Sequence, residues 1–315
     1  TVLPPYERSD NSEWYSGTAN AIYQNMNYME QYNPEYVLIL SGDHIYKMDY
    51  EVMLDFHKEN NADVTIATMP VPLEEASRFG IVIADEDKRI QDFEEKPEHP
   101  RSNLASMGIY IFSWKALKDA LNAMKDQGNC DFGKHIIPYC HEKKQRLFAY
   151  EYNGYWKDVG TIPSLWEANM EVLDPEHSGI NLFDEDWKIY SRNSGMPGHK
   201  ICAGANVENS MITDGCKIAG SVKHSILFAG VKVEAGAVVE DAVVMGRTTI
   251  KAGASVKHCI VAENVVIGEN AVVGAMPTEE EQGVATIGPD VCVGTGAKIG
   301  SNAMISEDVK DGEEK

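Results

Sequence analysis

The sequence predicts an α/β protein in two parts: an open, mainly parallel sheet domain followed by a parallel β-helix. Helical and strand patterns alternate from Pro34 to about Gly160, as in a sheet covered by helices. From about Ile201 the helical periodicity stops, and an aliphatic residue recurs every six positions. The 315 residues are also enough for two domains of ordinary size.

The first part resolves into strands and helices in a clear order. "EYVLIL" predicts a buried parallel strand, and "DYEVMLDFHKENN" predicts an amphipathic helix because Val52, Met53, Phe56 and His57 repeat near the helical period. "ADVTIATMPV" is β-branched and predicts the next strand. "GIVIADEDKRIQDFEEKP" indicates two short strands joined at an Asp-Glu-Asp turn. "LASMGIYIFS" predicts a further strand and "WKALKDALNAMKD" a further helix.

The second part has the repeat of a hexapeptide β-helix. In "TIGPDVCVGTGAKIGSNAMI" the aliphatic residues stand six apart, and a glycine follows each of the first three. We expect each aliphatic side chain to point into a triangular prism and each glycine to suit a tight corner. The positions concerned are Ile287, Val293, Ile299 and Ile305, with Gly288, Gly294 and Gly300; Ile267 and Val273 carry the same signature, and the six-residue spacing also occurs, with phase slips between groups, at Val233, Val239 and Met245 and at Ile250 and Val256.

Two segments depart from these patterns. "GAMPTEEEQGVATIG" carries Pro277 and the acidic run 279–281, which cannot face a prism interior, so we expect a loop leaving one corner of the coil. The stretch between the two parts has turn residues and no clear period. The predicted domains are therefore residues 1–175 and 201–315, with residues 176–200 as the linker.

Composition excludes several classes of partner. Acidic residues number 49 against 28 basic ones, giving a formal net charge of −21, whereas nucleic-acid binding needs a basic surface. A phosphorylated substrate remains compatible, because a few cations and a metal can create a local positive site. No apolar run has the length that crosses a bilayer. The six cysteines form no Cys-x-x-Cys pair, which is typical of reduced thiols in a cytoplasmic protein.

Two acids are candidate metal ligands. Asp43 follows the strand-like run "YVLIL" closely, and ligands of open α/β sheets bind beyond the carboxyl ends of strands. A carboxylate there can hold Mg²⁺, which takes one or two protein oxygens and otherwise water or phosphate. The alternative is that Asp43 caps the next helix. Asp158 in "YWKDVGT" could share the same ion, although "DVG" is equally typical of an ordinary turn.

Lys96 and Gly17 are candidate substrate contacts. Lys96 precedes Pro97, which favours extended backbone with a free N–H, and a lysine at a strand end suits a phosphate. The alternative is a solvent lysine that neutralises Glu94 and Glu95. In "EWYSGTANAIYQN", Gly17 would let a ligand ring approach the backbone, whereas the alternative is an ordinary helix start capped by Thr18.

In this order the motifs resemble one family, the bacterial glucose-1-phosphate adenylyltransferases, also called ADP-glucose pyrophosphorylases. The matching stretches cover essentially the whole chain: "WYSGTANAIYQN", "LILSGDHIYKMDY", "SRFGIVIAD", "FEEKP", "SMGIYIF", "DFGKHIIP" and "YWKDVGTIPSLWEAN". The resemblance implies a Rossmann-like nucleotidyltransferase domain followed by a left-handed β-helix. It also implies adenylyl transfer from ATP to glucose 1-phosphate in bacterial glycogen synthesis, with Mg²⁺ as cofactor.

The resemblance assigns roles to individual residues. It makes Asp43 and Asp158 the Mg²⁺ ligands and Lys96 the residue that holds the sugar phosphate. Other glucose 1-phosphate contacts would be Tyr15, Gly80, Glu95 and Ser106, and Gly17 would lie near the nucleotide base, with Trp156 and Phe132 lining the site. Family members form homotetramers, in some cases with a related regulatory subunit, so we expect self-association.

One departure and three rivals accompany the resemblance. The family opens with a strand and a Gly-rich, Arg-containing loop around the ATP phosphates; no such loop occurs here, so we expect this chain to be a fragment with little or no turnover. A hexapeptide acyltransferase would use His224 or His258. A non-catalytic regulatory subunit would be expected to lose Asp43, Lys96 or Asp158, which are all present. A sister nucleotidyltransferase with another sugar or base is the third rival.

Overall fold

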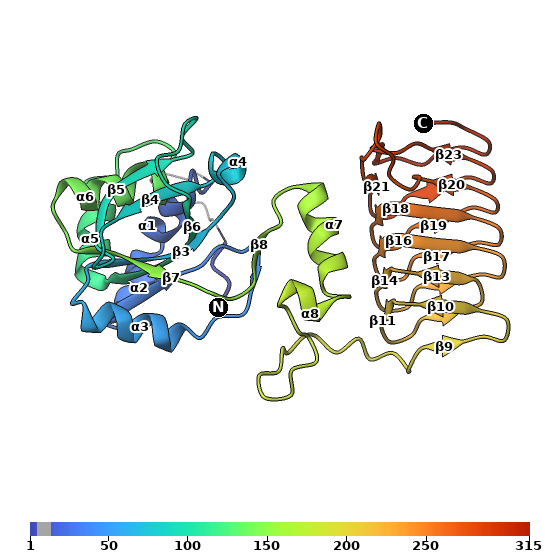
Figure 1. The fold of residues 1–315 in the computed structure, drawn as a ribbon, viewed down its shortest axis with the longest axis horizontal. Coiled ribbons are helices and arrows are strands. Elements are labelled where there is room, and N and C mark those ends of the chain that lie inside the picture. Colours follow the sequence, from blue (N-terminus) through green and yellow to red (C-terminus); the bar gives the residue numbers. More distant parts are fainter. Residues whose placement is uncertain (5–13) are drawn as a thin grey trace. The chain divides into compact units, whose positions relative to one another are not determined.

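The computed structural model describes residues 1–4 and 14–315 of the chain (Figure 1). It divides into two compact units. Unit 1 consists of residues 1–42 and 47–154, and unit 2 of residues 43–46 and 155–315. Within the described residues, no helix is both long enough and apolar enough to cross a membrane.

Unit 1 is a six-stranded sheet with helices packed against it. The strand order is β5–β4–β6–β3–β7, and β1 pairs with β6. The strands are β1 Tyr36–Ile39, β3 Val64–Pro70, β4 Gly80–Ala84, β5 Ile90–Glu95, β6 Leu104–Ser113 and β7 Leu147–Glu151. The helices are α1 Thr18–Gln24, α2 Met26–Glu30, α3 Tyr50–Glu59, α4 Leu73–Ala76, α5 Trp114–Ala123, the π-helix η1 Phe132–Ile136 and α6 Ile137–Glu142. The predicted α/β class is confirmed.

The expectation of a mainly parallel sheet is wrong for the described strands. Only β3 and β7 pair in parallel, whereas β1, β3 and β4 all run antiparallel to β6. β4 and β5 form a hairpin closed by the turn in which Lys88 N–H donates to the Asp85 carbonyl (3.0 Å), and a hairpin is antiparallel by construction. A hydrophobic run indicates that a strand is buried but does not indicate whether the neighbouring strands are parallel or antiparallel to it. The strand directions could therefore not be predicted from these runs.

Helix α3 follows its predicted span, with one error in its buried face. Asp49 begins it, its carboxylate accepting a hydrogen bond from Glu51 N–H (2.9 Å). Met53 and His57 are buried as expected, but Val52 is 53% exposed. His57 bonds Thr65 Oγ1 through Nδ1 (2.8 Å), and burial lowers the pKa of its imidazole to about 4.

Unit 2 begins with a two-stranded ribbon and two helices and continues into the β-helix. The ribbon pairs β2 His44–Tyr46 with β8 Trp156–Asp158, and α7 Ile162–Glu171 and α8 Pro175–Ser178 follow. Residues 179–199 contain no helix or strand, and the coil starts at β9 Lys200–Ile201. The β-helix therefore begins where the sequence pattern was predicted to change, near Ile201.

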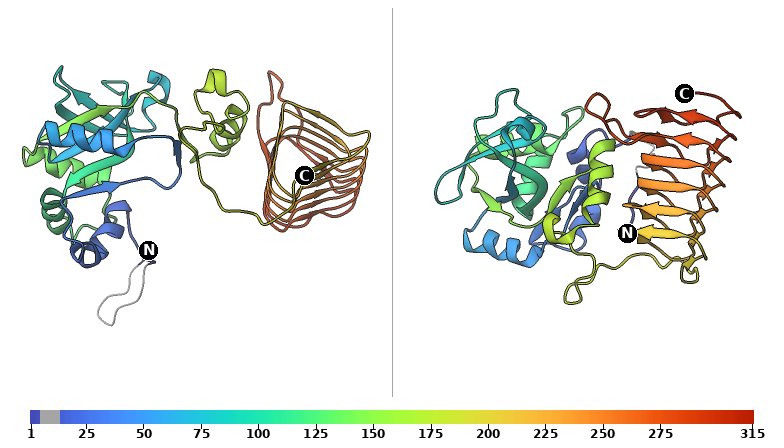
Figure 2. Two further views of the ribbon diagram at one scale, coloured as in Figure 1. Left: turned by 90° about the horizontal axis from the view of Figure 1, so that it is seen from below. Right: turned by 45° about the vertical axis from the view of Figure 1, so that its right-hand side comes forward.

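The β-helix has three faces of short parallel strands, seen from two further directions in Figure 2. The first face contains β9, β12 Lys217–Ile218, β15 Lys232–Val233, β17 Thr249–Ile250, β19 Val266–Ile267 and β22 Cys292–Val293. The second contains β10 Asn206–Glu208, β13 Ser221–Lys223, β16 Val238–Val244, β18 Ser255–Val261, β20 Val272–Val273 and β23 Lys298–Ile299. The third contains β11 Met211–Ile212, β14 Ile226–Leu227, the second halves of β16 and β18, β21 Ala285–Ile287 and β24 Met304–Ile305.

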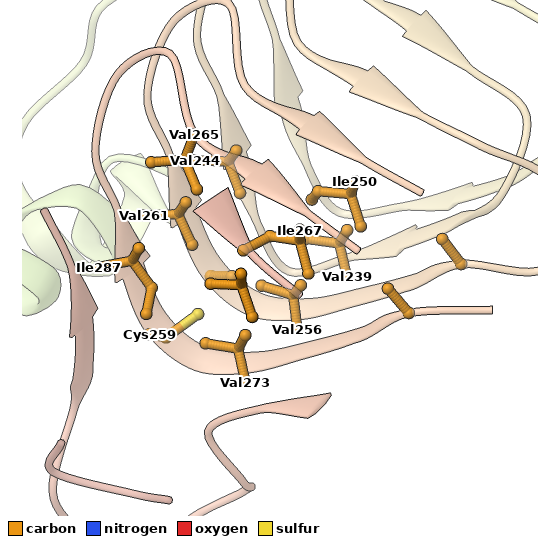
Figure 3. Packing of buried hydrophobic residues seen from close by; sticks show 14 of the residues in the cluster. Val239, Val244, Ile250, Val256, Cys259, Val261, Val265, Ile267, Val273 and Ile287 are labelled. Carbon is orange, nitrogen blue, oxygen red and sulfur yellow. The ribbon is translucent and has the colours of Figure 1, made fainter. Parts of the chain in front are cut away.

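The core of the β-helix is a set of aliphatic stacks. Val239, Val256 and Val273 occupy equivalent register positions in successive coils and are fully buried. Val244, Val261 and Ile287 form a second stack on the third face. Figure 3 shows these side chains directed into the interior of the coil. The hexapeptide β-helix prediction is confirmed.

Two details of that prediction need correction. Met245 packs outside the prism, against a cluster that includes Met170 of α7, because the chain turns a corner at Asp241 and shifts the alternation in β16. None of Gly288, Gly294 and Gly300 has the positive φ expected of a tight corner; a Cβ at Gly294 would lie 2.4 Å from Asp311 N, so this glycine allows the next coil to approach. Residues 275–284 leave the coil between β20 and β21, as the loop prediction requires.

Candidate functional site

The ribbon β2–β8 of unit 2 brings the backbones of the two candidate metal ligands close together. His44 pairs with Asp158 in the antiparallel register, and Val159 N–H donates to the Asp43 carbonyl (3.2 Å). Two acids from distant parts of the sequence therefore lie at adjacent backbone positions of one small ribbon.

The surroundings of the two acids decide between their alternative roles. Helix capping is wrong for Asp43, because the next element is strand β2 and Asp49 caps α3. The Asp43 side chain is 63% exposed, with its Oδ1 3.7 Å from His44 Nε2. Asp158 does make the turn that "DVG" suggested, since its Oδ1 accepts from Gly160 N–H (2.8 Å).

His44 and Trp156 support the ribbon from one side. The Trp156 indole N–H donates to His44 Nδ1 (3.3 Å), and the two rings meet edge to face at 5.4 Å. In neutral His44 this leaves the ring proton on Nε2, the nitrogen nearest the Asp43 carboxylate.

The donor set of this ribbon fits Mg²⁺. Carboxylate oxygens are the ligands that Mg²⁺ prefers, and it is commonly held by one or two of them together with substrate phosphates. Among residues 1–4 and 14–315, no group of three or more His, Cys, Asp or Glu side chains is arranged to hold a metal. Within the described residues, Asp43 and Asp158 are the two acids of this ribbon that could contact such an ion, whose other positions substrate oxygens and water would fill.

Helix α7 anchors strand β8 through two acids that sequence reasoning missed. Lys157 Nζ lies 2.9 Å from Glu167 Oε2 and 3.0 Å from Glu171 Oε1, and Tyr155 Oη donates to Glu171 Oε2 (2.5 Å). Burial and the Glu171 carboxylate both raise the pKa of the Tyr155 phenol. Glu167 and Glu171 are four residues apart and so share one face of α7, and this spacing was the sequence signal that could have identified them.

In unit 1 the β4–β5 hairpin places Gly80 against Glu95. The two residues pair directly in the register. A Cβ at Gly80 would lie 2.5 Å from Phe93 Cζ and 3.0 Å from Glu95 Oε2. Glycine therefore leaves the room that the Glu95 carboxylate occupies.

The π-helix η1 approaches the same carboxylate from another side. A Cβ at Gly133 would lie only 2.2 Å from Glu95 Oε2. Asp131 begins η1: its Oδ1 accepts from Gly133 N–H (2.9 Å), and its Oδ2 accepts from Thr18 Oγ1 (3.0 Å). The Asp131 carboxylate is a further member of the site, and the acid opening "DFGK" was the only signal for it.

The charged groups of this cluster act on the Glu95 carboxylate. Burial first, and then the Asp131 carboxylate, raise the pKa of Glu95, against the opposing effect of Lys96 and Lys134. Burial also raises the pKa of the Tyr110 phenol to about 12, with Ser106 as its hydrogen-bonding neighbour. The structure thus groups Gly80, Glu95 and Ser106 on β4, β5 and β6.

Aromatic rings support the cluster from below. Phe132 is 4% exposed and stacks on Tyr110, with centroids 5.6 Å apart and an interplanar angle of 25°. Phe132 is therefore part of the core under the site, and its ring is not free to line it.

Lys96 differs from the expectation for its backbone. Its φ is +49°, in the left-handed region, and its N–H donates to the Phe79 carbonyl (3.1 Å), so the predicted extended backbone with a free N–H is wrong. A non-glycine residue held in this region costs free energy, and such residues are frequent at functional sites. Glu94 is paired with Arg101 instead of Lys96. No ion pair joins the exposed Lys96 to any carboxylate in the described part of the chain.

Gly17 is tied to the cluster, and Tyr15 is not. Gly17 has φ +94°, and a Cβ there would lie 2.1 Å from the Cys130 carbonyl oxygen, next to Asp131. Thr18 is the first residue of α1 and makes no capping bond, so that alternative is wrong. The Tyr15 hydroxyl donates to the Leu3 carbonyl (2.7 Å) and accepts from Asn25 Nδ2 (2.8 Å).

The β-helix histidines also have definite partners. His224 Nδ1 and His258 Nδ1 each lie 2.7 Å from a different oxygen of Asp241. Both imidazole rings therefore contact the same carboxylate, and all three residues lie in unit 2.

In this chain a mixed α/β sheet with glycines around a half-buried glutamate is joined to a hexapeptide coil. The family model for nucleotidyl transferases matches residues 1–175, and the chain belongs to that family. A second model, of the GlmU-like C-terminal hexapeptide type, matches residues 199–294.

The chain is also similar in sequence to several named enzymes. A glucose-1-phosphate adenylyltransferase of Lachnospira eligens is 66% identical over 234 residues, which is 74% of this chain and 55% of that protein. Enzymes of the same name from Bacillus cereus and Bacillus anthracis are 58% identical over 247 residues, 78% of this chain and 65% of theirs. The chain thus spans between about half and two thirds of the length of these relatives.

Proposed function

We propose that this chain carries the sugar-phosphate and metal sites of a glucose-1-phosphate adenylyltransferase. The observation that supports this most is the cluster of Gly80, Glu95 and Ser106 beside an exposed Lys96 with left-handed backbone. Relatives at 58–66% identity bear that enzyme's name. The reaction would convert ATP and glucose 1-phosphate into ADP-glucose and pyrophosphate.

Glu95 would recognise the sugar. Its carboxylate sits in a space that is kept open by Gly80 and Gly133, so its oxygens can accept hydrogen bonds from glucose hydroxyls. Burial and the Asp131 carboxylate raise the pKa of Glu95, and sugar hydroxyls would donate hydrogen bonds to its oxygens. Ser106, buried beside Tyr110, would offer a neutral partner.

Lys96 would recognise the phosphate. An exposed lysine without an ion pair can place its ammonium on a phosphate oxygen without breaking an existing interaction. The Phe79 hydrogen bond fixes the backbone of Lys96 at the end of β5 and limits the positions that Nζ can reach. Lys96 would thereby reduce the repulsion between two anionic substrates.

The chemistry needs no protein nucleophile. A phosphate oxygen of glucose 1-phosphate bonds to the α-phosphorus of ATP, the bond from that phosphorus to the β-phosphate oxygen breaks, and pyrophosphate leaves with the electron pair. Asp43 and Asp158 would hold Mg²⁺, which when bound neutralises charge on phosphate oxygens. The chain's own contribution is positioning and electrostatic stabilisation.

A titration of glucose 1-phosphate in the presence of Mg²⁺ tests the proposal. Lys96→Ala should weaken binding by about tenfold or more, because a charge-assisted bond contributes about 1.5–3 kcal/mol. Lys115→Ala removes an exposed lysine on α5 and serves as the matched control. Equal affinities for the two variants would remove Lys96 from the site. ADP-glucose detected by mass spectrometry after addition of ATP would demonstrate the transfer and would contradict the expectation that this chain has little or no turnover.

A further inference from the structure

The His224–Asp241–His258 cluster forms one ladder on the β-helix. The parallel registers of β13, β16 and β18 set the three residues opposite one another in successive coils. All three have positive φ, +42°, +58° and +42°, so the same corner repeats. Asp241 accepts from both imidazoles and is 7% exposed.

Helix α7 covers one end of this ladder. The Trp166 ring lies 4.4 Å from the His258 ring, centroid to centroid, and its indole N–H donates to the Asp241 carbonyl (2.9 Å). His258 is 5% exposed. Since Nδ1 is committed to Asp241, Nε2 of the neutral ring is a hydrogen-bond acceptor.

His258 Nε2 has no hydrogen-bond partner among the residues that the structure describes. Within those residues, Gln145 Oε1 is the one fully buried side-chain oxygen or nitrogen without a partner. Nε2 is therefore in contact with solvent, although His258 as a whole is only 5% exposed. An acceptor in this position is available to a ligand.

A pocket of about 680 Å³ lies over His258. Trp166 and Glu167 of α7 line it, and so do Thr278 and Glu279 of the loop 275–284 that leaves the coil. Thr278 N–H donates to the Glu281 carbonyl (2.8 Å), which closes a turn at the tip of that loop. Helix, coil and loop, all parts of unit 2, thus surround a single space.

The lining selects a positively charged ligand. The lining residues include the acids Glu167 and Glu279 together with His258 and Trp166, and no lysine or arginine. Glu167 is already paired with Lys157 (2.9 Å), whereas no cation lies within ion-pair distance of Glu279 in the described residues. Phosphates would be repelled, and an ammonium group on an alkyl chain gains both hydrogen bonds and ring contact.

We propose that this pocket binds a small organic ammonium ion. Its charged nitrogen contacts the Glu279 carboxylate and His258 Nε2, and its alkyl chain lies along Trp166. The pocket consists of unit 2 residues, whereas Gly80, Glu95 and Lys96 belong to unit 1, and its chemistry is opposite in charge to that of the proposed sugar-phosphate site.

Putrescine is the probe, titrated calorimetrically into the 315-residue chain. Glu279→Gln should weaken binding about fivefold, the upper range for an accessible ion pair. Glu280→Gln removes the same charge from the neighbouring exposed residue, which does not line the pocket, and should leave the affinity within about twofold. Both positions are on the exposed loop, so the fold should tolerate either change.

Three outcomes would overturn the proposal. The first is absence of binding at millimolar putrescine. The second is an equal loss in Glu279→Gln and Glu280→Gln, which would show attraction by acidic charge alone. The third is equal affinity for 1,4-butanediol, which has a similar shape and no charge. Selective loss in Glu279→Gln together with weak diol binding would support the proposal.

Discussion

Gly133→Ala tests the geometry of the proposed sugar site with a single methyl group. The added Cβ would lie 2.2 Å from Glu95 Oε2 and 2.8 Å from Glu95 Cδ, far inside normal contact distance. The Glu95 carboxylate is at the end of a flexible side chain, so it should move away from the added methyl group while the backbone conformation stays unchanged. The chain should therefore remain folded and lose the correct position of Glu95.

The size of the effect follows from the interaction that is lost. Hydrogen bonds to a charged group contribute about 1.5–3 kcal/mol, which corresponds to roughly 10- to 150-fold in Kd for glucose 1-phosphate. Gly128→Ala is the matched control, because a Cβ there meets nothing within 4 Å. Calorimetry gives the affinity and a thermal melt verifies folding. A folded Gly133→Ala chain that binds glucose 1-phosphate as tightly as the Gly128→Ala chain would refute the role of Glu95.

Two further predictions concern charge. Glu95→Gln should raise the free energy of unfolding at pH 7. The pKa of Glu95 is raised above 4.5 in the folded state, so the charged carboxylate destabilises the fold once the pH rises above 4.5. The gain in the free energy of unfolding should therefore vanish in melts below pH 4.5, where the carboxyl group is protonated in both states. An equal gain at both pH values would contradict this. Asp158→Asn should abolish the increase in melting temperature that Mg²⁺ produces, whereas Asp126→Asn, a change at an exposed acid, should retain it. Retention of the Mg²⁺ effect by both variants would exclude Asp158 as a ligand.

Local signals predicted the elements well because each element is coded over a short stretch. β6 has the span expected from "LASMGIYIFS", and the hairpin at Asp85 was visible as turn residues between two apolar runs. The six-residue repeat gave the β-helix directly, since each coil buries the same positions. Alternation failed only where corners shift it, as at Met245.

Long-range features could not be predicted in the same way. The directions of the strands depend on chain connections that hydrophobic runs do not encode. Lys96 adopts a positive φ because Phe79, on the neighbouring segment, holds its N–H. Asp131 enters the site through contacts with Thr18 and Gly133, and only the first of these is distant in sequence. The sequence linked Asp43 and Asp158 only as a hypothesis; the ribbon β2–β8 brings their backbones together, and a shared metal ion stays a prediction.

The most direct test of the central claim separates the phosphate from the sugar. Glucose 1-phosphate and methyl α-D-glucoside are titrated into the unaltered chain and into Lys96→Ala. If Lys96 binds the phosphate, the substitution weakens glucose 1-phosphate binding about tenfold or more and leaves the glucoside unchanged. An equal loss for both ligands, or no loss for either, would contradict the assignment of this cluster as a sugar-phosphate site.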